Sequence, residues 1–432
     1  MASRPVHKSR PMTGRGHHLL KADQGFATGG GLIARLRSIG IRRIVDRVDA
    51  GLDRGGLAID LPDGSSRRLG FRGDGPQATV RIVSWMALVR LATSGSVGWY
   101  KAWANREWDS PDPVRIFELF SANAVPLGNV GRAKGLAKWL NRSWHGLRDN
   151  SPVGAKANVA AHYDLGNDFY AAWLDGTMTY SSARFGSDSD SLEEAQRRKV
   201  DLLLDRLDLK PGQRLLEIGC GWGNLAIQAA QRGVDVVGLT LSTEQKAFAE
   251  ARIAALALSG RIDIRLQDYR DCAEQFDAVA SVEMVEAVGR RWWPAYLGCI
   301  ARNLRPGGRA ALQYIAMDHA VFDRYAASPD FIQTYIFPGG ILLDEPVFAT
   351  IARDSGLEWA DRDAFGLDYA ETLLRWRSRY DAAAKSGALP GFDEQFHRLW
   401  RYYLMYCEGG FRGGAIDVAQ VTLVKRSSVT AR

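Results

Sequence analysis

Five short apolar runs, separated by helical segments, occupy the second half of this 432-residue chain. The runs span residues 214–218, 234–240, 262–266, 276–282 and 309–315. Strands that alternate with helices form a parallel sheet covered by helices on both faces. The run 418–426 follows without another crossover, which predicts an antiparallel edge strand. The expected fold class is therefore a doubly wound α/β sheet, with helical insertions near 320–345 and 370–412.

A glycine-rich loop directly follows the first of these runs. The sequence LLEIGCGWGNLA places Gly219, Gly221 and Gly223 between a strand and a helix, where open α/β sheets bind ligands. A dinucleotide-binding loop would have a further glycine at the position of Asn224. The spacing therefore favours S-adenosylmethionine over NAD as the cofactor.

Polar side chains follow the next two strands. GLTLSTEQ offers Thr240, Ser242 and Gln245 in place of the acidic residue that usually contacts a ribose. Ser242 and Gln245 also match the pattern of a helix cap, and the two roles are compatible. After the third strand, LQDYRD puts Asp268 and Tyr269 where an adenine ring would lie.

The first 155 residues are electropositive. They carry 24 Lys and Arg against 12 Asp and Glu, whereas the rest of the chain carries 32 against 37. No nucleic-acid motif accompanies this charge, so an anionic membrane surface is the expected partner and nucleic acid is not. A basic surface that only confers solubility is the alternative.

The composition shifts divide the chain into four parts. We expect a flexible basic tail at 1–30, a smaller α+β domain associated with lipid or membrane at 31–130, and the catalytic domain at 156–432. Between them, residues 131–155 form an amphipathic basic helix, which either lies in a membrane interface or connects the domains. In the N-terminal domain we expect a helix at 32–45, two short strands around a Pro-Asp-Gly turn, and further helices from Ser84 and Pro113.

No apolar run reaches the length of a membrane-spanning helix, and the basic N-terminus lacks the apolar core of a signal peptide. We therefore expect a cytoplasmic protein that binds peripherally at the inner face of the cell membrane. The four cysteines are scattered, and the seven histidines do not cluster apart from His17 and His18 in the tail, so no metal site is expected. The oligomeric state stays open, with a homodimer as one option.

Six blocks, in order, resemble the family of cyclopropane-fatty-acyl-phospholipid synthases and mycolic acid methyltransferases. The blocks are HYDLGNDFYAAWLDGTMTYSSARF (162–185), LLEIGCGWG (215–223), GLTLSTEQ (238–245), VEMVEAVG (282–289), YIFPGG (335–340) and YYLMYCEGGFR (402–412). The resemblance covers about residues 55–425 and implies the class I fold of methyltransferases that use S-adenosylmethionine. It implies carbon transfer to the double bond of an unsaturated phospholipid acyl chain, giving a cyclopropane or a methyl or methylene branch.

The same resemblance implies which residues form the site. Those that close over the cofactor are Tyr180, Ser181, Gly219, Gly221, Thr240, Leu241, Ser242 and Gln245. A bicarbonate ion beside the reacting carbon would be held by Glu286, Ile315 and Tyr369. The chain has Ser182 and Gln313 where the family usually has a Cys and a His, which weakens this anion site. EAVG with LQxI resembles a branch that includes enzymes forming methyl or methylene branches, so the product stays open.

The chemistry adds further candidates. Methylation of an alkene creates a carbocation, which aromatic faces stabilise. The candidate rings are Tyr180, Phe185, Tyr314, Tyr335, Phe337 and Tyr369. Of these, Phe337 is expected in the ordinary core. Glu286 is the candidate base, and Glu283 is expected to be a helix-start carboxylate.

Cys407 aligns with a cysteine that the family pattern sometimes marks as catalytic, although a buried structural role is favoured. Two alternatives to lipid methylation stay open. One is methylation of a small soluble acceptor on the same fold. The other is a catalytically silent lipid-binding protein.

Overall fold

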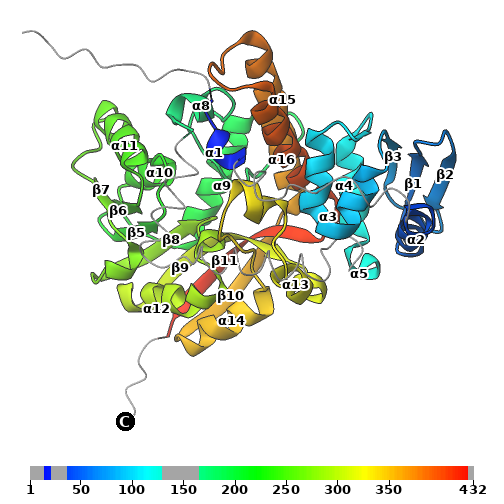
Figure 1. The fold of residues 1–432 in the computed structure, drawn as a ribbon. Coiled ribbons are helices and arrows are strands. Elements are labelled where there is room, and N and C mark those ends of the chain that lie inside the picture. The colour runs from blue at the N-terminus through cyan, green and yellow to red at the C-terminus, as the bar shows by residue number, and fades with distance from the viewer. Residues whose placement is uncertain (1–13, 21–36, 129–164, 427–432) are drawn as a thin grey trace, which may run out of the picture.

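The computed structural model describes residues 14–20, 37–128 and 165–426 (Figure 1). The linker helix predicted at 131–155 lies outside these ranges. Among the described residues, no helix combines the length and apolar character needed to cross a membrane.

The N-terminal domain is a small four-stranded sheet with helices. Its elements are α2 (Arg37–Ala50), β1 (Gly56–Asp60), β2 (Ser66–Gly70), β3 (Gln77–Ile82), α3 (Met86–Ala104), β4 (Trp108–Asp109), α4 (Pro113–Ala122) and α5 (Ala124–Leu127). The order is β2-β1-β3-β4, with β1 antiparallel to β2 and parallel to β3. The predicted hairpin is confirmed. Sequence analysis missed β3, although its residues alternate between exposed and buried along the strand.

The catalytic domain contains a seven-stranded sheet in the order β10-β11-β9-β8-β5-β6-β7. The strands are β5 (Arg214–Ile218), β6 (Asp235–Thr240), β7 (Ile262–Leu266), β8 (Phe276–Val282), β9 (Leu304–Met317), β10 (Leu357–Ala364) and β11 (Ile416–Lys425). Strands β5 to β9 run parallel, as predicted. The strand order reverses beside β5, which places the ligand-binding crevice at the carboxyl ends of β5 and β8.

One strand assignment was wrong. The strand β11 is antiparallel to β9, as expected, but it does not form the edge of the sheet. The edge is β10, which pairs with β11 and was missed. Six of its eight residues are charged or exposed alanine, so it lacks the apolar run by which the other strands were recognised. Charged side chains of this kind protect an edge strand from pairing with another chain.

Helices cover both faces of this sheet (Figure 1). One face packs against α9 (Leu192–Arg206), α10 (Asn224–Gln231) and α11 (Thr243–Ala255), and the other against α12 (Trp293–Asn303) and α14 (Glu345–Asp354). Along β5, Leu215 belongs to the first core and Leu216 to the second. This alternation is what a doubly covered parallel strand requires.

The two predicted helical insertions are present. The first contains α13 (His319–Ala326) and a π-helical turn (Ile332–Ile336), and the second contains α15 (Gly366–Ser386) and α16 (Glu394–Gly413). Helix α16 lies against α4 of the N-terminal domain (Figure 1). A methyl group at Gly409 or Gly413 would overlap α4, so these glycines allow the two backbones to approach closely.

Residues 14–20 depart from the flexible tail that the sequence predicts. They contain the short helix α1 (His17–Leu20), in which Leu19 and Leu20 are buried. Arg15 forms an ion pair with Asp168 at 2.8 Å. This part of the tail is therefore packed on the catalytic domain.

Candidate functional site

A cavity of about 640 Å³ opens at the carboxyl ends of β5 and β8. The glycine loop, the ends of β6 and β8, and the helices α15 and α16 all contribute to its wall. A ligand cavity at this point is what the strand order predicts.

The glycine loop, here called the glycine cradle, has a backbone conformation that residues with a side chain rarely adopt. Gly219, Gly221 and Gly223 have φ values of +82°, +51° and +83°. The amides of Gly219 and Cys220 donate to the carbonyl oxygen of Leu239 at 3.0 and 2.9 Å, which fixes the loop to β6. A Cβ on Gly221 would meet no atom within 4 Å, so the space beside it is open to a ligand. Gly219 and Gly221 line the cavity, whereas Gly223 does not.

The loop after β6 combines a helix cap with a cavity wall. Ser242 accepts a hydrogen bond from the amide of Gln245 at 3.2 Å, and Thr240 donates to Gln245 Oε1 at 3.0 Å. Thr240, Leu241 and Gln245 line the cavity, but Ser242 does not. Ser242 therefore serves as the cap, and the prediction that it also contacts the cofactor is not supported.

Asp268 and Tyr269 line the cavity as predicted, together with Arg270. Asp268 accepts hydrogen bonds from Arg270 Nε and Nη2 at 2.8 and 2.6 Å. Burial alone would raise the pKa of Asp268, but the hydrogen bonds from Arg270 outweigh it and the net shift is downward. Asp268 is thus a charged acceptor at the place where a purine amino group is expected.

The segment before α9 closes one side of the cavity. Tyr180 and Ser181 line the wall, and the Tyr180 hydroxyl lies 2.8 Å from that of Tyr403 on α16. Lys199 donates from its buried ammonium to Ser181 Oγ at 2.6 Å. Burial lowers the pKa of Lys199 to about 8, and the charge of Glu283 opposes this shift.

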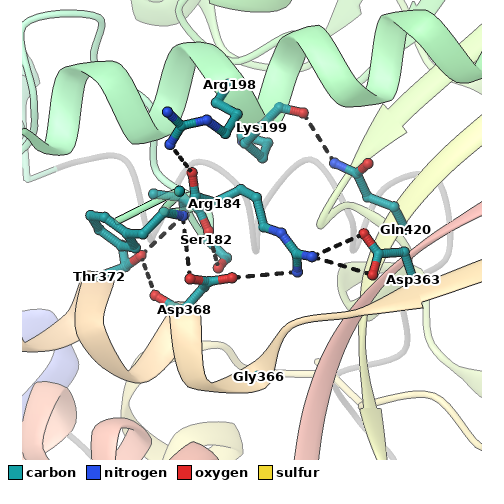
Figure 2. A network of polar contacts seen from close by, with 12 residues as sticks. Ser182, Arg184, Arg198, Lys199, Asp363, Gly366, Asp368, Thr372 and Gln420 are labelled. Carbon is teal, nitrogen blue, oxygen red and sulfur yellow. Dashed lines mark hydrogen bonds and ion pairs between the residues drawn. The ribbon is translucent and has the colours of Figure 1, made fainter. Parts of the chain in front are cut away.

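Helix α15 holds the next residues of this segment in place (Figure 2). The amide of Ala183 donates to Thr372 Oγ1 at 3.1 Å, and Arg184 pairs with Asp368 at 3.4 Å. Thr372 and Asp368 flank Tyr369 on the same helix. The closing segment and Tyr369 are therefore positioned as one unit.

Glu283 lies at the centre of the polar site. Sequence analysis missed this role. Its Oε1 accepts from the amide of Ser182 at 2.9 Å and from Gln313 Nε2 at 2.8 Å. Its Oε2 accepts from the Tyr369 hydroxyl at 2.7 Å. Glu283 has a φ of +47°, a backbone conformation that is rare outside glycine and that concentrates at functional sites. Its position at the carboxyl end of β8 was the available signal.

Glu286 has fewer partners. Its Oε1 accepts from the amide of Ile315 at 2.5 Å, whereas no described residue donates to its Oε2. Burial, followed by the charge of Glu283, raises the pKa of Glu286 to about 8. Burial also raises the pKa of Glu283, but Lys199 and three hydrogen-bond donors oppose that shift. Glu283 is therefore the better stabilised carboxylate, and Glu286 is mostly protonated at neutral pH.

The residues expected to hold bicarbonate do not fit that ion. Ser182, Gln313 and Tyr369 already donate to Glu283. Gln313 Oε1 accepts from Gln420 at 3.1 Å, and the Ser182 hydroxyl donates to the carbonyl of Ala183. Neither Ser182 nor Gln313 lines the cavity. A second anion among these donors would be repelled by the Glu283 carboxylate.

Three of the six candidate aromatic rings, Tyr180, Phe337 and Tyr369, line the cavity. Phe337, which was expected in the ordinary core, packs against that core and also lines the cavity. Tyr314 and Tyr335 are buried elsewhere, in contact with Trp359 and Tyr100 respectively, and Phe185 lies under the guanidinium of Arg375. Sequence analysis missed the rings of α16 that face the cavity, Tyr402, Tyr403 and Tyr406.

Cys407 and Ile315 also line the cavity. Burial raises the pKa of the Cys407 thiol well above its ordinary value, so the thiol stays protonated. Within 14–20, 37–128 and 165–426, no cluster of His, Cys, Asp or Glu could hold a metal ion.

The site fits S-adenosylmethionine. The glycine cradle leaves room for a ligand, Asp268 and Gln245 offer hydrogen-bonding groups, and the Glu283 carboxylate supplies negative charge for a positively charged sulfur. No further glycine occupies position 224, where a dinucleotide loop would require one.

Comparisons with known proteins agree with this fit. The family model described as mycolic acid cyclopropane synthetase matches residues 151–421. The tuberculostearic acid methyltransferase UfaA1 of Mycobacterium tuberculosis is 40% identical over 349 residues, which are 78% of this chain and 80% of that protein. The cyclopropane-fatty-acyl-phospholipid synthase of Escherichia coli is 41% identical over 60% of this chain and 65% of its own length.

The fold also matches the solved structure of a relative that was determined with S-adenosylhomocysteine bound. The mycolic acid cyclopropane synthase CmaA1, complexed with S-adenosylhomocysteine and CTAB, aligns with a TM-score of 0.58 at 34% identity. The alignment covers 62% of this chain and 98% of that one. The chain therefore belongs to the mycolic acid cyclopropane synthetase family and is an S-adenosylmethionine-dependent methyltransferase.

Proposed function

We propose that this enzyme methylates the double bond of an unsaturated acyl chain in a membrane phospholipid. The observation that carries the proposal is the composition of the cavity wall. One part holds the glycine cradle with Glu217, Asp268, Glu283 and Glu286, and the rest is mostly aliphatic and aromatic, with a few polar residues such as Arg324 and Asp330. A hydrocarbon chain with a reactive double bond needs both parts, whereas a small polar acceptor would leave the apolar part unused.

S-adenosylmethionine supplies an electrophilic methyl group on a positively charged sulfur when it is bound. The residues that would hold it are the glycines of the cradle, Gln245 and Asp268. The rings of Tyr180, Phe337 and Tyr369 line the cavity, where aromatic groups would stabilise the cation that methylation creates. Because these rings exclude water, the cation is not captured as an alcohol.

Glu283 is the proposed base. A carboxylate offers about four acceptor positions, and three on Glu283 are filled by Ser182, Gln313 and Tyr369. The remaining position on Oε2 is available to take a proton from the methylated acyl chain. Glu286, which is protonated beside it, keeps a second negative charge away from the site. Removal of a proton from the added methyl carbon, with bond formation to the adjacent cationic carbon, would close a ring. If a hydride first shifts from the methylated carbon to that cation, loss of a proton from the same methyl carbon would leave a methylene branch.

The cytoplasmic, peripheral location at the inner face of the cell membrane also remains part of the proposal. Its support is the excess of basic residues in the first 155 positions, which attracts anionic phospholipids. Charge reversal of Lys134, Lys138 and Arg142 tests it in a vesicle sedimentation assay. We expect weaker binding of the triple Glu variant at low salt and a smaller difference at high salt. Equal binding of both proteins at low salt would refute this membrane contact.

The acceptor is tested by incubating the purified protein with methyl-labelled S-adenosylmethionine and vesicles of dioleoylphosphatidylglycerol. Label in the lipid is expected, and NMR of the product distinguishes a ring from a branch. Label that appears only in small molecules from an added cell extract would favour a soluble acceptor. Lipid binding without transfer would favour a catalytically silent lipid-binding protein.

A further inference from the structure

The cavity at the cofactor loop continues into the interior of the N-terminal domain. Its wall includes Gly221 and Glu286 at one end and Leu57, Leu69 and Val80 of the small sheet at the other. The catalytic site therefore shares a continuous space with a domain that contributes none of the carboxylates described above.

The far end of this space, here called the N-terminal chamber, is aliphatic. It lies among α2, α4 and the inner face of the small sheet, and its wall includes Val45, Leu57, Ile59, Leu69, Val80 and Ile116. Each of these side chains is 4% exposed or less. A chamber with such a wall excludes water and ions but accepts hydrocarbon. Left empty, it would cost stability, because its lining atoms lack contacts on one side.

A break in α3 lies on the wall of the cavity. Gly95 has φ 59° and ψ −136°, which interrupts the helix, and it lines the cavity without a side chain. The adjacent Ser96 accepts a hydrogen bond from the amide of Phe331 at 3.1 Å, which fixes the break to the first catalytic insertion. The rings of Phe117 and Tyr402, 5.2 Å apart, bring the two domains together on the same wall.

We propose that the N-terminal chamber receives hydrocarbon of the lipid substrate, so that the N-terminal domain forms part of the acyl-binding site and selects substrates by chain length. This inference rests on the proposed function. Two parts of a phospholipid can supply the hydrocarbon: the methyl-terminal segment of the reacting chain, and the second acyl chain. Both are matched by the same aliphatic wall.

The first test fills the chamber. In Val80→Trp the new ring would occupy the chamber, whereas Thr79→Trp places the same ring on the exposed side of the same strand. Vesicle substrates carry a double bond at a constant distance from the carboxyl group and methyl-terminal segments of different lengths. We expect Val80→Trp to lower kcat/KM for the longest segment at least about tenfold relative to the shortest. Thr79→Trp should leave this ratio unchanged.

A second lipid series identifies the source of the hydrocarbon. Here the reacting chain is constant, and the second chain is long, short or absent, as in a lysophospholipid. If kcat/KM of Val80→Trp depends on chain length in the first series, the chamber receives the methyl-terminal segment. If it depends on chain length in the second series, the chamber receives the second acyl chain. An equal loss of kcat/KM on every lipid, or no loss on any lipid, would overturn the proposal. If thermal melting shows that Val80→Trp is not folded, Leu69→Phe is used in its place.

A binding measurement separates this inference from the proposed reaction. The wild-type protein is mixed with a phosphatidylglycerol whose acyl chain has a terminal photoreactive diazirine, and crosslinked peptides are mapped by mass spectrometry. Crosslinks on β1, β2 or β3 are expected and require no methyl transfer. Crosslinks confined to the outer surface would overturn the inference even if the lipid is methylated. If no lipid is methylated but crosslinks fall in the chamber, only the proposed reaction fails.

Discussion

Tyr369 donates its phenolic proton to Glu283 Oε2 at 2.7 Å, which joins the first turn of α15 to the carboxyl end of β8. Tyr369 also stacks on Phe411 of α16, with ring centroids 4.4 Å apart. The carboxylate and the aromatic wall of the cavity are therefore fixed by the same residue. A base held in this way loses little freedom when it acts, which favours proton transfer in one geometry.

The role of Glu283 can be tested with Glu283→Gln. The amide keeps the size of the side chain but cannot accept a proton, so we expect kcat to fall at least about hundredfold. Isothermal titration should also show a weaker affinity for S-adenosylmethionine, because the neutral amide offers no negative charge to the sulfur, but the loss should be smaller than the loss in kcat. Glu286→Gln preserves the neutral state of that residue and should lower kcat only about tenfold. The reverse order of the two effects would assign the base to Glu286.

Activity should not depend on bicarbonate. The donors that would hold the ion are bound to Glu283, so removing dissolved carbon dioxide is expected to leave kcat unchanged. The measurement compares degassed buffer with the same buffer supplemented with bicarbonate. The same comparison is made with Glu283→Gly, in which the space occupied by the Glu283 carboxylate is empty. Stimulation of the wild type by bicarbonate would show that Glu283 does not fill the anion's place.

Much of this fold was predictable because its strands are apolar runs in a regular alternation with helices. The strands β5, β7 and β8 have the predicted boundaries, and the glycine cradle lies where its spacing indicated. The edge strand β10 escaped prediction, because an edge is half solvated and its residues are mostly exposed. Pairing, rather than composition, defines such a strand.

The polar site was less predictable than the fold. Glu283 and Glu286 are three residues apart and both suit a helix start, so only the tertiary structure shows which one meets Tyr369. The same holds for Phe337, whose ring packs against the core and also lines the cavity. The joining of the catalytic cavity to the N-terminal domain depends on contacts between α4 and α16, which lie far apart in the sequence.

The cofactor cradle is tested with Gly221→Ala. The added methyl group meets no protein atom within 4 Å, but it enters the space assigned to the cofactor. We expect the dissociation constant for S-adenosylmethionine to rise at least about tenfold, with a loss of stability of about 1–2 kcal/mol from the positive φ. Gly212→Ala is the matched control, since Gly212 also has a positive φ and open space around it. Weakened cofactor binding in both variants would mean that backbone strain, and not contact, is responsible.

Glu286 should make the stability of the protein depend on pH. Its folded pKa of about 8 lies above the unfolded value of about 4.3, so folding is penalised as the pH rises from about 5 to 8 and the penalty is constant above that. The penalty is at most about 1.4 kcal/mol per pH unit. Glu286→Gln removes it, so the Tm of this variant should rise relative to wild type between about pH 5.5 and 8. Differential scanning calorimetry at constant ionic strength measures the difference.

The control for this effect is Glu244→Gln at the start of α11. Hydrogen bonds from its own amide, Thr243 and Ser242 lower the pKa of Glu244, so its contribution to stability is lost only as the pH falls below about 5. The Tm difference for Glu244→Gln should therefore be flat between about pH 5.5 and 8. If Glu286→Gln gives an equally flat line, the Glu286 carboxyl is ionised at neutral pH. The division of roles between Glu286 and Glu283 would then be wrong, because both carboxylates would carry charge in the resting site.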